Sequence, residues 1–412
     1  MSTTFDLSTL GLADGTYSVA AVAKGTNLKN SAVSTAVGYE VKPGEPNYLT
    51  FSSPSTFTLK VGYNKKYWDG TLEYSTDAAT WNAWDGTVIN SSADGKLYMR
   101  GVGNTLITGN NPYQYGSPTA TWVFTGSNVS CEGNIETLLD YATVAAGEHP
   151  EMADYCYYYL FRGWTSLITV PELPSPTLTR YCYNSMFYNC KSITSAPELP
   201  ATTLADYCYS LMFYGCTALT SAPELPVATL TAGCYSSMFS GCTALTSAPE
   251  LQATTLADYC YASMFYGCTT LTTIPKLPAT TLATNCYSRM FHTCKSITSA
   301  PELPATTLAD SCYKSMFYQC TSLTTIPKLP ATTLATDCYY GMFSGCTSVK
   351  FSTSQSGIYQ TAYRIPTSGT GTTASSALMG MFYNTGGSYT GDDIGTPAIN
   401  TTYYLSTSNT VV

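Results

Sequence analysis

The chain has 412 residues and a mass of 44.2 kDa, more than the ~100–200 residues of an ordinary domain, so we expect several modules. Lys and Arg number 18 against 26 Asp and Glu, and the net charge is −8. This acidic balance argues against nucleic-acid binding, which requires a basic surface. No stretch approaches the ~20 apolar residues of a membrane-spanning helix, so we expect no membrane insertion.

The first residues lack a secretory signal. Such a signal needs a basic segment followed by ~7–15 apolar residues, and Met1-Ser-Thr-Thr-Phe-Asp-Leu has neither. If Met1 is the natural start, the chain is made in a cytoplasm and not exported by the usual route. A secreted chain whose signal had been removed would look the same.

Residues 1–45 are predicted to form part of a β module. Alternating apolar residues around an Asp14-Gly15 turn, followed by Ala36-Val-Gly-Tyr-Glu-Val, indicate strands. They resemble the closing strands of a fibronectin type III-like or immunoglobulin-like module whose opening strands are missing. Because an open sheet edge tends to pair with another chain, we expect this module to attach to another virion or surface protein, or to a second copy in a homo-oligomer.

Residues 46–130 are predicted to form a second β-rich, sandwich-like module. Its Trp68, Trp81 and Trp84 are candidate binding residues, because an indole ring can stack on a sugar. Core packing is the favoured alternative for all three. Residues 131–350 are predicted to be a capped solenoid of eight coils, and residues 351–412 a divergent ninth coil with a C-terminal cap.

The solenoid prediction follows from a repeat of 26 residues. Two columns of Cys recur at this step, eight residues apart: Cys156, Cys182, Cys208, Cys234, Cys260, Cys286, Cys312 and Cys338, and then Cys190, Cys216, Cys242, Cys268, Cys294, Cys320 and Cys346. A fixed period of this size indicates stacked units, and it is too short for a four-stranded propeller blade. A unit so small cannot bury its own apolar side, so successive coils must stack, giving a rod roughly 40 Å long at a strand spacing of ~4.8 Å.

Each coil is predicted to hold one short helix. Four apolar residues fall at i, i+4, i+5 and i+8, which is one helical face: Cys208, Met212, Phe213 and Cys216. Asp206 and its equivalents stand where an N-cap is expected, and Gly215 and its equivalents stand where a left-handed residue would end the helix.

The other half of each coil is predicted to be extended. Pro223 and Pro226 remove backbone donors, so the parallel strand beside Thr220 should span only about three to four residues. The Thr column that includes Thr220 favours a strand with a half-buried face. A regular Thr grid also occurs in ice-binding solenoids, but the prolines interrupt this one.

The coil sequence Leu-Thr-Ser…Leu-Pro…Ala-Asp-Tyr-Cys-Tyr…Met-Phe-Tyr-Gly-Cys-Thr-Ala-Leu resembles the BspA-like leucine-rich repeat of bacterial surface proteins. The likeness covers residues 152–350. It implies an α/β solenoid in which each coil has a short parallel strand and a short helix. The coil differs from the family pattern, which has 22–24 residues and a Leu-x-x-Leu-x-Leu strand, so the strand position and the curvature are open.

Little in the sequence points to catalysis, and we expect no enzyme, metal or cofactor. Two Cys eight apart on a helix lie ~12 Å apart, too far for a disulfide, and the spacing is not that of a zinc site, so buried thiols are expected. One charged column comprises Glu172, Glu198, Glu224, Glu250, Lys276, Glu302 and Lys328. Its equivalent, solvated carboxylates lack the asymmetry of an acid–base pair.

The residues that follow each Met-Phe pair are candidate binding residues: Tyr188, Tyr214, Tyr266, His292 and Tyr318. Tyr beside small Ser and Gly is typical of recognition surfaces, although drift at exposed positions gives the same pattern. We therefore predict a non-enzymatic adhesion or receptor-recognition protein that binds a host-surface glycan or protein, at a virion surface as a phage fibre or a head or tail decoration. The alternatives are a bacterial cell-surface adhesin without its signal and a purely structural decoration protein.

Overall fold

The structure is a computed structural model that describes residues 15–19, 37–41, 48–62, 67–108, 121–388 and 395–412. It divides into two units, Met1–Asn47 and Tyr48–Val412. In the first unit, β1 (Gly15–Val19) pairs antiparallel with β2 (Val37–Val41). The remainder of the fibronectin- or immunoglobulin-like module predicted for residues 1–45 lies outside the described residues.

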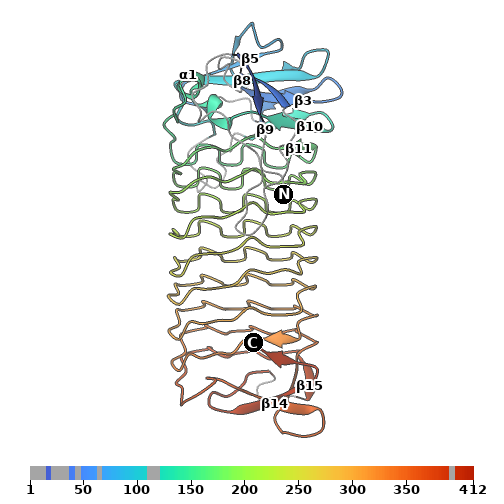
Figure 1. Cartoon of the computed structure of the whole chain (residues 1–412), viewed down its shortest axis with the longest axis vertical. Helices are drawn as coiled ribbons and strands as arrows, with labels where there is room; N and C mark the ends of the chain where they lie inside the picture. Colours follow the sequence, from blue (N-terminus) through green and yellow to red (C-terminus); the bar gives the residue numbers. More distant parts are fainter. Residues whose placement is uncertain (1–14, 20–36, 42–47, 63–66, 109–120, 389–394) are drawn as a thin grey trace. The chain divides into compact units, whose positions relative to one another are not determined.

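The second unit begins with two sheets (Figure 1). The strands are β3 (Leu49–Ser52), β4 (Thr58–Val61), β5 (Thr71–Ser75), β6 (Asn82–Trp84), β7 (Ile89–Asn90), β8 (Lys96–Val102), β9 (Trp122–Thr125), β10 (Val129–Glu132) and β11 (Leu167–Thr169). One sheet has the order β11-β10-β3-β8-β5-β6, and the other has the order β7-β4-β9. Alternate residues of β3 and β8 are buried, because successive side chains of a strand point to opposite faces.

A short helical segment connects these sheets to the first coil. It consists of η2 (Ile135–Leu138) and α1 (Tyr141–Ala145), whose N-caps Asn134 and Asp140 accept backbone N–H bonds through their side chains. β10 pairs in parallel with β11, which belongs to the first coil. The backbone bond from Ile135 N to Glu172 O adds a further link, so the solenoid begins on a hydrogen-bonded edge.

Eight coils of 26 residues then stack along the unit (Figure 1). We number them from residue 155, so that coil 3 comprises residues 207–232, coil 4 residues 233–258 and coil 5 residues 259–284. The predicted helix is wrong: the segment between the two Cys columns of each coil is a run of consecutive turns. We call the surface formed by these segments, which are residues 207–216 in coil 3 and its equivalents, the turn face.

Backbone hydrogen bonds of the turn face alternate between two directions. In coil 3, the N–H groups of Tyr209, Leu211 and Phe213 donate to carbonyls of coil 4, over 2.9–3.0 Å. The N–H groups of the residues between them donate three residues back within their own coil, as Met212 N does to Tyr209 O at 3.2 Å. All ten N–H groups from residue 207 to residue 216 are hydrogen-bonded, so this irregular backbone leaves no donor unpaired.

The left-handed conformation predicted for the Gly column is confirmed, although it does not end a helix. Gly215 has a φ of +70°, and Tyr207 and Leu211 of the same coil are also left-handed, at +55° and +58°. Left-handed residues therefore recur every four residues, which is what turns the chain back repeatedly. Asp206, predicted as an N-cap, instead accepts the N–H of Ala232 in the next coil through its carboxylate, at 3.1 Å.

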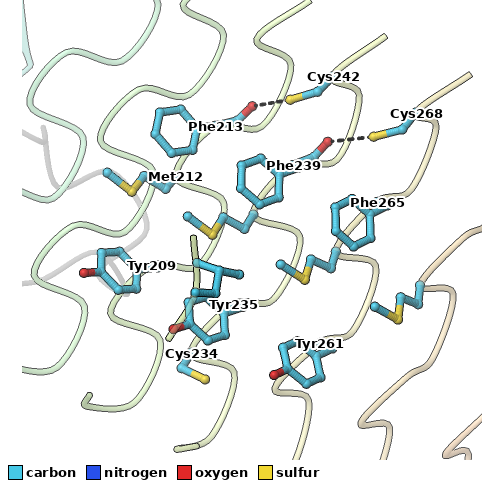
Figure 2. Close-up of a cluster of buried hydrophobic side chains, with 14 of the residues drawn as sticks. Tyr209, Met212, Phe213, Cys234, Tyr235, Phe239, Cys242, Tyr261, Phe265 and Cys268 are labelled. Carbon is cyan, nitrogen blue, oxygen red and sulfur yellow. Dashed lines mark hydrogen bonds between the residues drawn. The ribbon is translucent and has the colours of Figure 1, made fainter. Parts of the chain in front are cut away.

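The stacking places equivalent side chains in continuous buried columns (Figure 2). One column of rings runs from Tyr157 to Tyr339 and another from Phe161 to Phe343, with centroids 5.5–5.9 Å apart between neighbours. Met212 and its equivalents are fully buried beside them. Burying a ring of this size contributes about 1.5–3 kcal/mol, so each added coil is stabilised by the one before it.

All sixteen cysteines are free and buried, as predicted. Those of the second column also act as hydrogen-bond donors. The thiol of Cys268 donates to the carbonyl of Phe239 in the preceding coil at 3.1 Å, and the six other thiols of this column make the equivalent bond over 2.9–3.2 Å. Burial raises the pKa of Cys268 to about 12, so the group keeps its proton and its donor function at neutral pH.

In most coils a single β-bridge stands where the parallel strand was predicted. Bridges join Ser195 to Ser221, Ser247 to Thr273 and Ser299 to Thr325, whereas none joins Thr273 to Ser299 in this described region. At this position the coils are therefore bridged in pairs. Thr220 and its equivalents in five coils are exposed or partly exposed, so the expected half-buried Thr face is largely in contact with solvent.

A ninth, divergent coil and a small sheet follow. Phe343 N donates to Met381 O, and Gly345 N donates to Tyr383 O, which continues the turn-face pattern. The sheet has the order β14-β16-β13-β15, and a short pair of strands joins β12 to β17. Their bounds are β12 (Thr325–Ile326), β13 (Lys350–Ser352), β14 (Tyr359–Arg364), β15 (Gly386–Ser388), β16 (Thr402–Ser406) and β17 (Thr410–Val411).

The donor function of the second Cys column predicts different costs for two serine substitutions in one coil. Cys268→Ser supplies another donor for the Phe239 carbonyl, whereas the thiol of Cys260 donates to no described atom, so Cys260→Ser buries an unpaired hydroxyl. We expect Cys260→Ser to lower the free energy of unfolding by ~1–3 kcal/mol more than Cys268→Ser, measured by denaturant unfolding. Equal losses would show that the S–H bond contributes nothing.

Candidate functional site

The turn face presents the predicted binding residues as one surface column. Tyr188, Tyr214, Tyr266, His292 and Tyr318 occupy the same position in coils 2, 3, 5, 6 and 7. We call this column the aromatic ladder. The backbone bonds between coils hold equivalent residues in register, so rings in adjacent coils stack on one another.

Stacking distances divide the ladder into two parts. Tyr188 and Tyr214 stack with centroids 4.6 Å apart, at an interplanar angle of 4°. His292 stacks on Tyr266 and on Tyr318, with centroids 4.5 Å apart in both pairs. Ser240 takes the position between Tyr214 and Tyr266, and no ring stands there.

Basic side chains lie close to both parts of the ladder, Arg162 beside Tyr188 and Arg289 near His292. The guanidinium of Arg162 lies 5.2 Å from the centre of the Tyr188 ring, which is a cation–π distance. Burial, with a smaller effect from the charge of Arg289, lowers the pKa of His292 to about 4. The imidazole is therefore neutral at physiological pH and stacks as an uncharged ring.

The structure separates the three tryptophans from the ladder. Trp68 and Trp84 are 3% and 4% exposed and stack on each other, so they belong to the core of the β-rich module and present no surface to a ligand. Trp81 is half-buried, and the guanidinium of Arg100 lies 4.1 Å from its ring centre. Arg100 lies equally close to Tyr141 and bonds Glu73 at 2.6 Å. The protein's own cation therefore covers Trp81.

A second column of tyrosines on the turn face was not predicted from the sequence, and its members range from buried, as Tyr181 is, to exposed, as Tyr259 is. Tyr155, Tyr181 and Tyr207, each one residue before a Cys of the first column, stack with centroids 4.7 and 4.9 Å apart. Tyr259 is 44% exposed at the same position. The signal was present, because Tyr recurs there in four coils.

The titratable groups of the coils are poorly arranged for catalysis. Glu172 and its equivalents in the charged column are all exposed. Burial raises the pKa of Cys216 to about 12, so its thiol is not a ready nucleophile. A pair that was not predicted from the sequence lies in the cap, where the buried Glu136 places its Oε2 2.8 Å from Nδ1 of the exposed His149. Burial raises the pKa of Glu136, and the His149 bond opposes that shift.

An open groove lies on the side of the coils that holds the prolines. It measures about 700 Å³ and is lined by Ile274–Pro278, Thr298–Pro301 and neighbouring residues, with Lys276 and Glu302 among them. The groove coincides with the missing bridge between Thr273 and Ser299. The groove therefore lies where two adjacent coils lack a β-bridge, and its lining includes the cationic side chain of Lys276 and the carboxylate of Glu302.

The described part of the chain holds neither a candidate membrane span nor a candidate metal site. No helix there is long and apolar enough to cross a bilayer. Nor do three or more His, Cys, Asp or Glu side chains gather there as a metal site.

The repeats match a known protein family. A model of the BspA-type leucine-rich repeat region matches residues 148–263 and 235–365, in six copies. The chain belongs to the BspA-type leucine-rich repeat family. This confirms the resemblance noted in the coil sequence, and it indicates a protein of the surface or adhesion type. Comparisons with curated proteins and with solved structures gave no significant match.

The lowered pKa of His292 predicts a defined acid sensitivity. In the unfolded chain the imidazole titrates near 6.5, and in the folded chain near 4, so protonation favours unfolding as the pH falls from 6.5 towards 4. His292→Phe keeps a ring in the ladder and removes the titrating group. We expect the variant to lose less stability than the wild type across this interval, measured by denaturant unfolding at each pH. Identical pH dependence would show that His292 is not desolvated.

Proposed function

We propose that this chain is a non-enzymatic adhesion protein that binds a host-surface glycan or protein through its turn face. The aromatic ladder is the observation that carries the proposal. Its rings are partly exposed, and Tyr266 is exposed over 37% of its surface. Rigid amphipathic rings offer contact area at a low entropic cost, which suits recognition.

The repeat supports this function by holding the rings in register. The bond from Gly215 N to Ser240 O, at 2.7 Å, fixes the backbone beside the ladder, and equivalent bonds recur in the other coils. Binding therefore requires little reorganisation of the protein, and a preorganised surface loses less free energy on association.

A binding role also agrees with the state of the reactive groups. The carboxylates of the charged column are exposed and equivalent, and the thiols are buried and protonated. General acid–base or nucleophilic chemistry needs groups placed in contrasting environments or activated by neighbours. We therefore propose binding without catalysis.

For the carrier of this surface, our proposal is a phage particle, on which the chain would serve as a fibre or as a head or tail decoration. The sequence of residues 1–45 motivates this, because its expected strands would offer a sheet edge that can pair with another virion protein or with a second copy of the chain. The alternative carrier is a bacterial cell surface. Structural phage genes beside this gene would support the first carrier, and genes for surface anchoring would support the second.

Binding of the full-length chain to bacterial envelopes tests the proposal. We expect saturable binding at micromolar concentration or below, measured by sedimentation of envelopes with labelled protein. Tyr266→Ala should weaken it about tenfold, since a stacked ring contributes ~1 kcal/mol or more. Glu250→Ala, an exposed change outside the turn face, is the matched control. No binding at micromolar concentration, or equal loss in both variants, would contradict the proposal.

A further inference from the structure

The open groove on the proline side lies between coil 5 and coil 6, which comprises residues 285–310. It measures about 700 Å³, within the ~300–1,000 Å³ of ligand pockets, and none of its lining residues belongs to the turn face. Four backbone groups along it have no partner among the described residues: the carbonyls of Thr272 and Ile274 and the N–H groups of Lys276 and Thr298.

Coil 7, residues 311–336, repeats the sequence of this groove, and there a strand occupies the equivalent positions. Residues 272–278 and 324–330 both read Thr-Thr-Ile-Pro-Lys-Leu-Pro. In coil 7 this segment pairs in parallel with the C-terminal strand β17. The acceptors and the donor that correspond to Thr272 O, Ile274 O and Lys276 N are all bonded to it. These bonds run from Thr410 N to Thr324 O at 3.1 Å, from Val412 N to Ile326 O at 3.0 Å and from Lys328 N to Val412 O at 2.9 Å.

The inserted strand leaves the turn face intact. Asn409, which precedes β17, donates through Nδ2 to carbonyls of coils 7 and 8, and its Oδ1 accepts the N–H of Lys350 at 3.0 Å. Lys350 is the equivalent of Thr298 in the groove. On the turn face of the same two coils, Phe317 N still donates to Met342 O at 3.0 Å. Two stacked coils can therefore hold an extended strand between them on this side.

Burial differs between the two copies of the segment. Ile326 is fully buried in coil 7, whereas Ile274 is only half-buried in coil 5. Thr325 is half-buried, whereas Thr273 is exposed. Coil 5 therefore leaves open both the apolar surface and the backbone groups that coil 7 covers with β17.

We propose that the groove between coils 5 and 6 binds an extended segment of a partner protein, paired in parallel with residues 272–278 as β17 pairs with coil 7. Strand addition of this kind takes its affinity from main-chain hydrogen bonds and its specificity from alternate side chains. The segment that fits has the chemistry of residues 409–412, which are Asn-Thr-Val-Val: uncharged and β-branched, with a leading Asn. Its Thr would meet Thr273 as Thr410 Oγ1 meets Thr325 Oγ1, at 2.7 Å.

The chain's own C-terminal strand is already engaged. Val412 belongs to the lining of the groove, but the backbone of β17 is bonded to coil 7. The same holds for β17 of a second copy, so we assign the groove to a separate protein. The site lies off the turn face, and it does not depend on the proposed adhesion function.

A peptide with the sequence of residues 405–412 tests the proposal. Its binding to the full-length chain is measured by the fluorescence anisotropy of a labelled peptide, and we expect saturation at or below millimolar concentration. N-methylation at the positions of Thr410 and Val412, whose N–H groups donate to coil 7, should weaken binding about tenfold or more, because two main-chain bonds are lost. N-methylation at the position of Leu405, which lies outside the paired segment, should leave binding unchanged.

Two variants of the full-length chain locate the site. Thr273→Arg puts a bulky side chain where coil 7 contacts Thr410, and it should weaken peptide binding about tenfold or more. Ser195→Arg is the matched control, because it changes the equivalent exposed position of coil 2, which is bridged to coil 3. Both variants should fold as the wild type does, since both side chains are exposed, and circular dichroism checks this.

Several outcomes would overturn the assignment. These are no binding at millimolar concentration, equal binding of the peptide methylated at Thr410 and Val412, equal loss in both arginine variants, and binding that survives Thr273→Arg, which would place the peptide elsewhere, as in exchange with β17. Self-association of the wild type that Thr273→Arg abolishes would put a second copy in the groove and refute the separate partner. Thr273→Arg should leave envelope binding unchanged, so this proposal and the adhesion function can fail separately.

Discussion

Alternating backbone hydrogen bonds on the turn face are the interaction on which the rest of the structure depends. Every second N–H, such as that of Phe213, crosses to the next coil, and every other one closes a turn within its own coil. Outside the turn face, β-bridges join coils 1, 2 and 3, coils 4 and 5, and coils 6 and 7, but none among the described residues joins coil 3 to coil 4 or coil 5 to coil 6. Continuity along the solenoid therefore comes from the turn face, and a coil with this backbone cannot exist without neighbours, because half of its donors would be unpaired.

The backbone bonds between coils determine the arrangement of both the buried side chains and the surface side chains. Because equivalent residues of successive coils are held in register, Tyr and Phe form continuous buried columns, and the outward positions form columns of their own. The aromatic ladder is the exposed counterpart of the buried rings. Coil 4 has Ser240 where coils 3 and 5 have tyrosine. The backbone is the same with and without the ring, since Ser240 O accepts the N–H of Gly215 as its equivalents do in other coils. Recognition can therefore vary while the fold is kept.

The repeat and the columns of equivalent residues were predicted correctly from the sequence. The local backbone conformation between the two Cys columns was not. Apolar residues at Cys208, Met212 and Phe213 fit a helical period of 3.6, but consecutive turns repeat every four residues, and nine residues are too few to separate the two periods. The left-handed residues were predicted at Gly215 but not at Tyr207 or Leu211, because non-glycine residues rarely adopt that conformation. The ladder residues were predicted from their recurrence.

Amide hydrogen exchange of coil 3, resolved residue by residue, tests the central claim most directly. If bonds between coils hold the solenoid together, the amides of Tyr209, Leu211 and Phe213 exchange as slowly as that of Met212, and only through cooperative unfolding of the stack. Exchange of these three amides orders of magnitude faster than that of Met212 would show that only the turns within a coil are formed, and it would contradict this account.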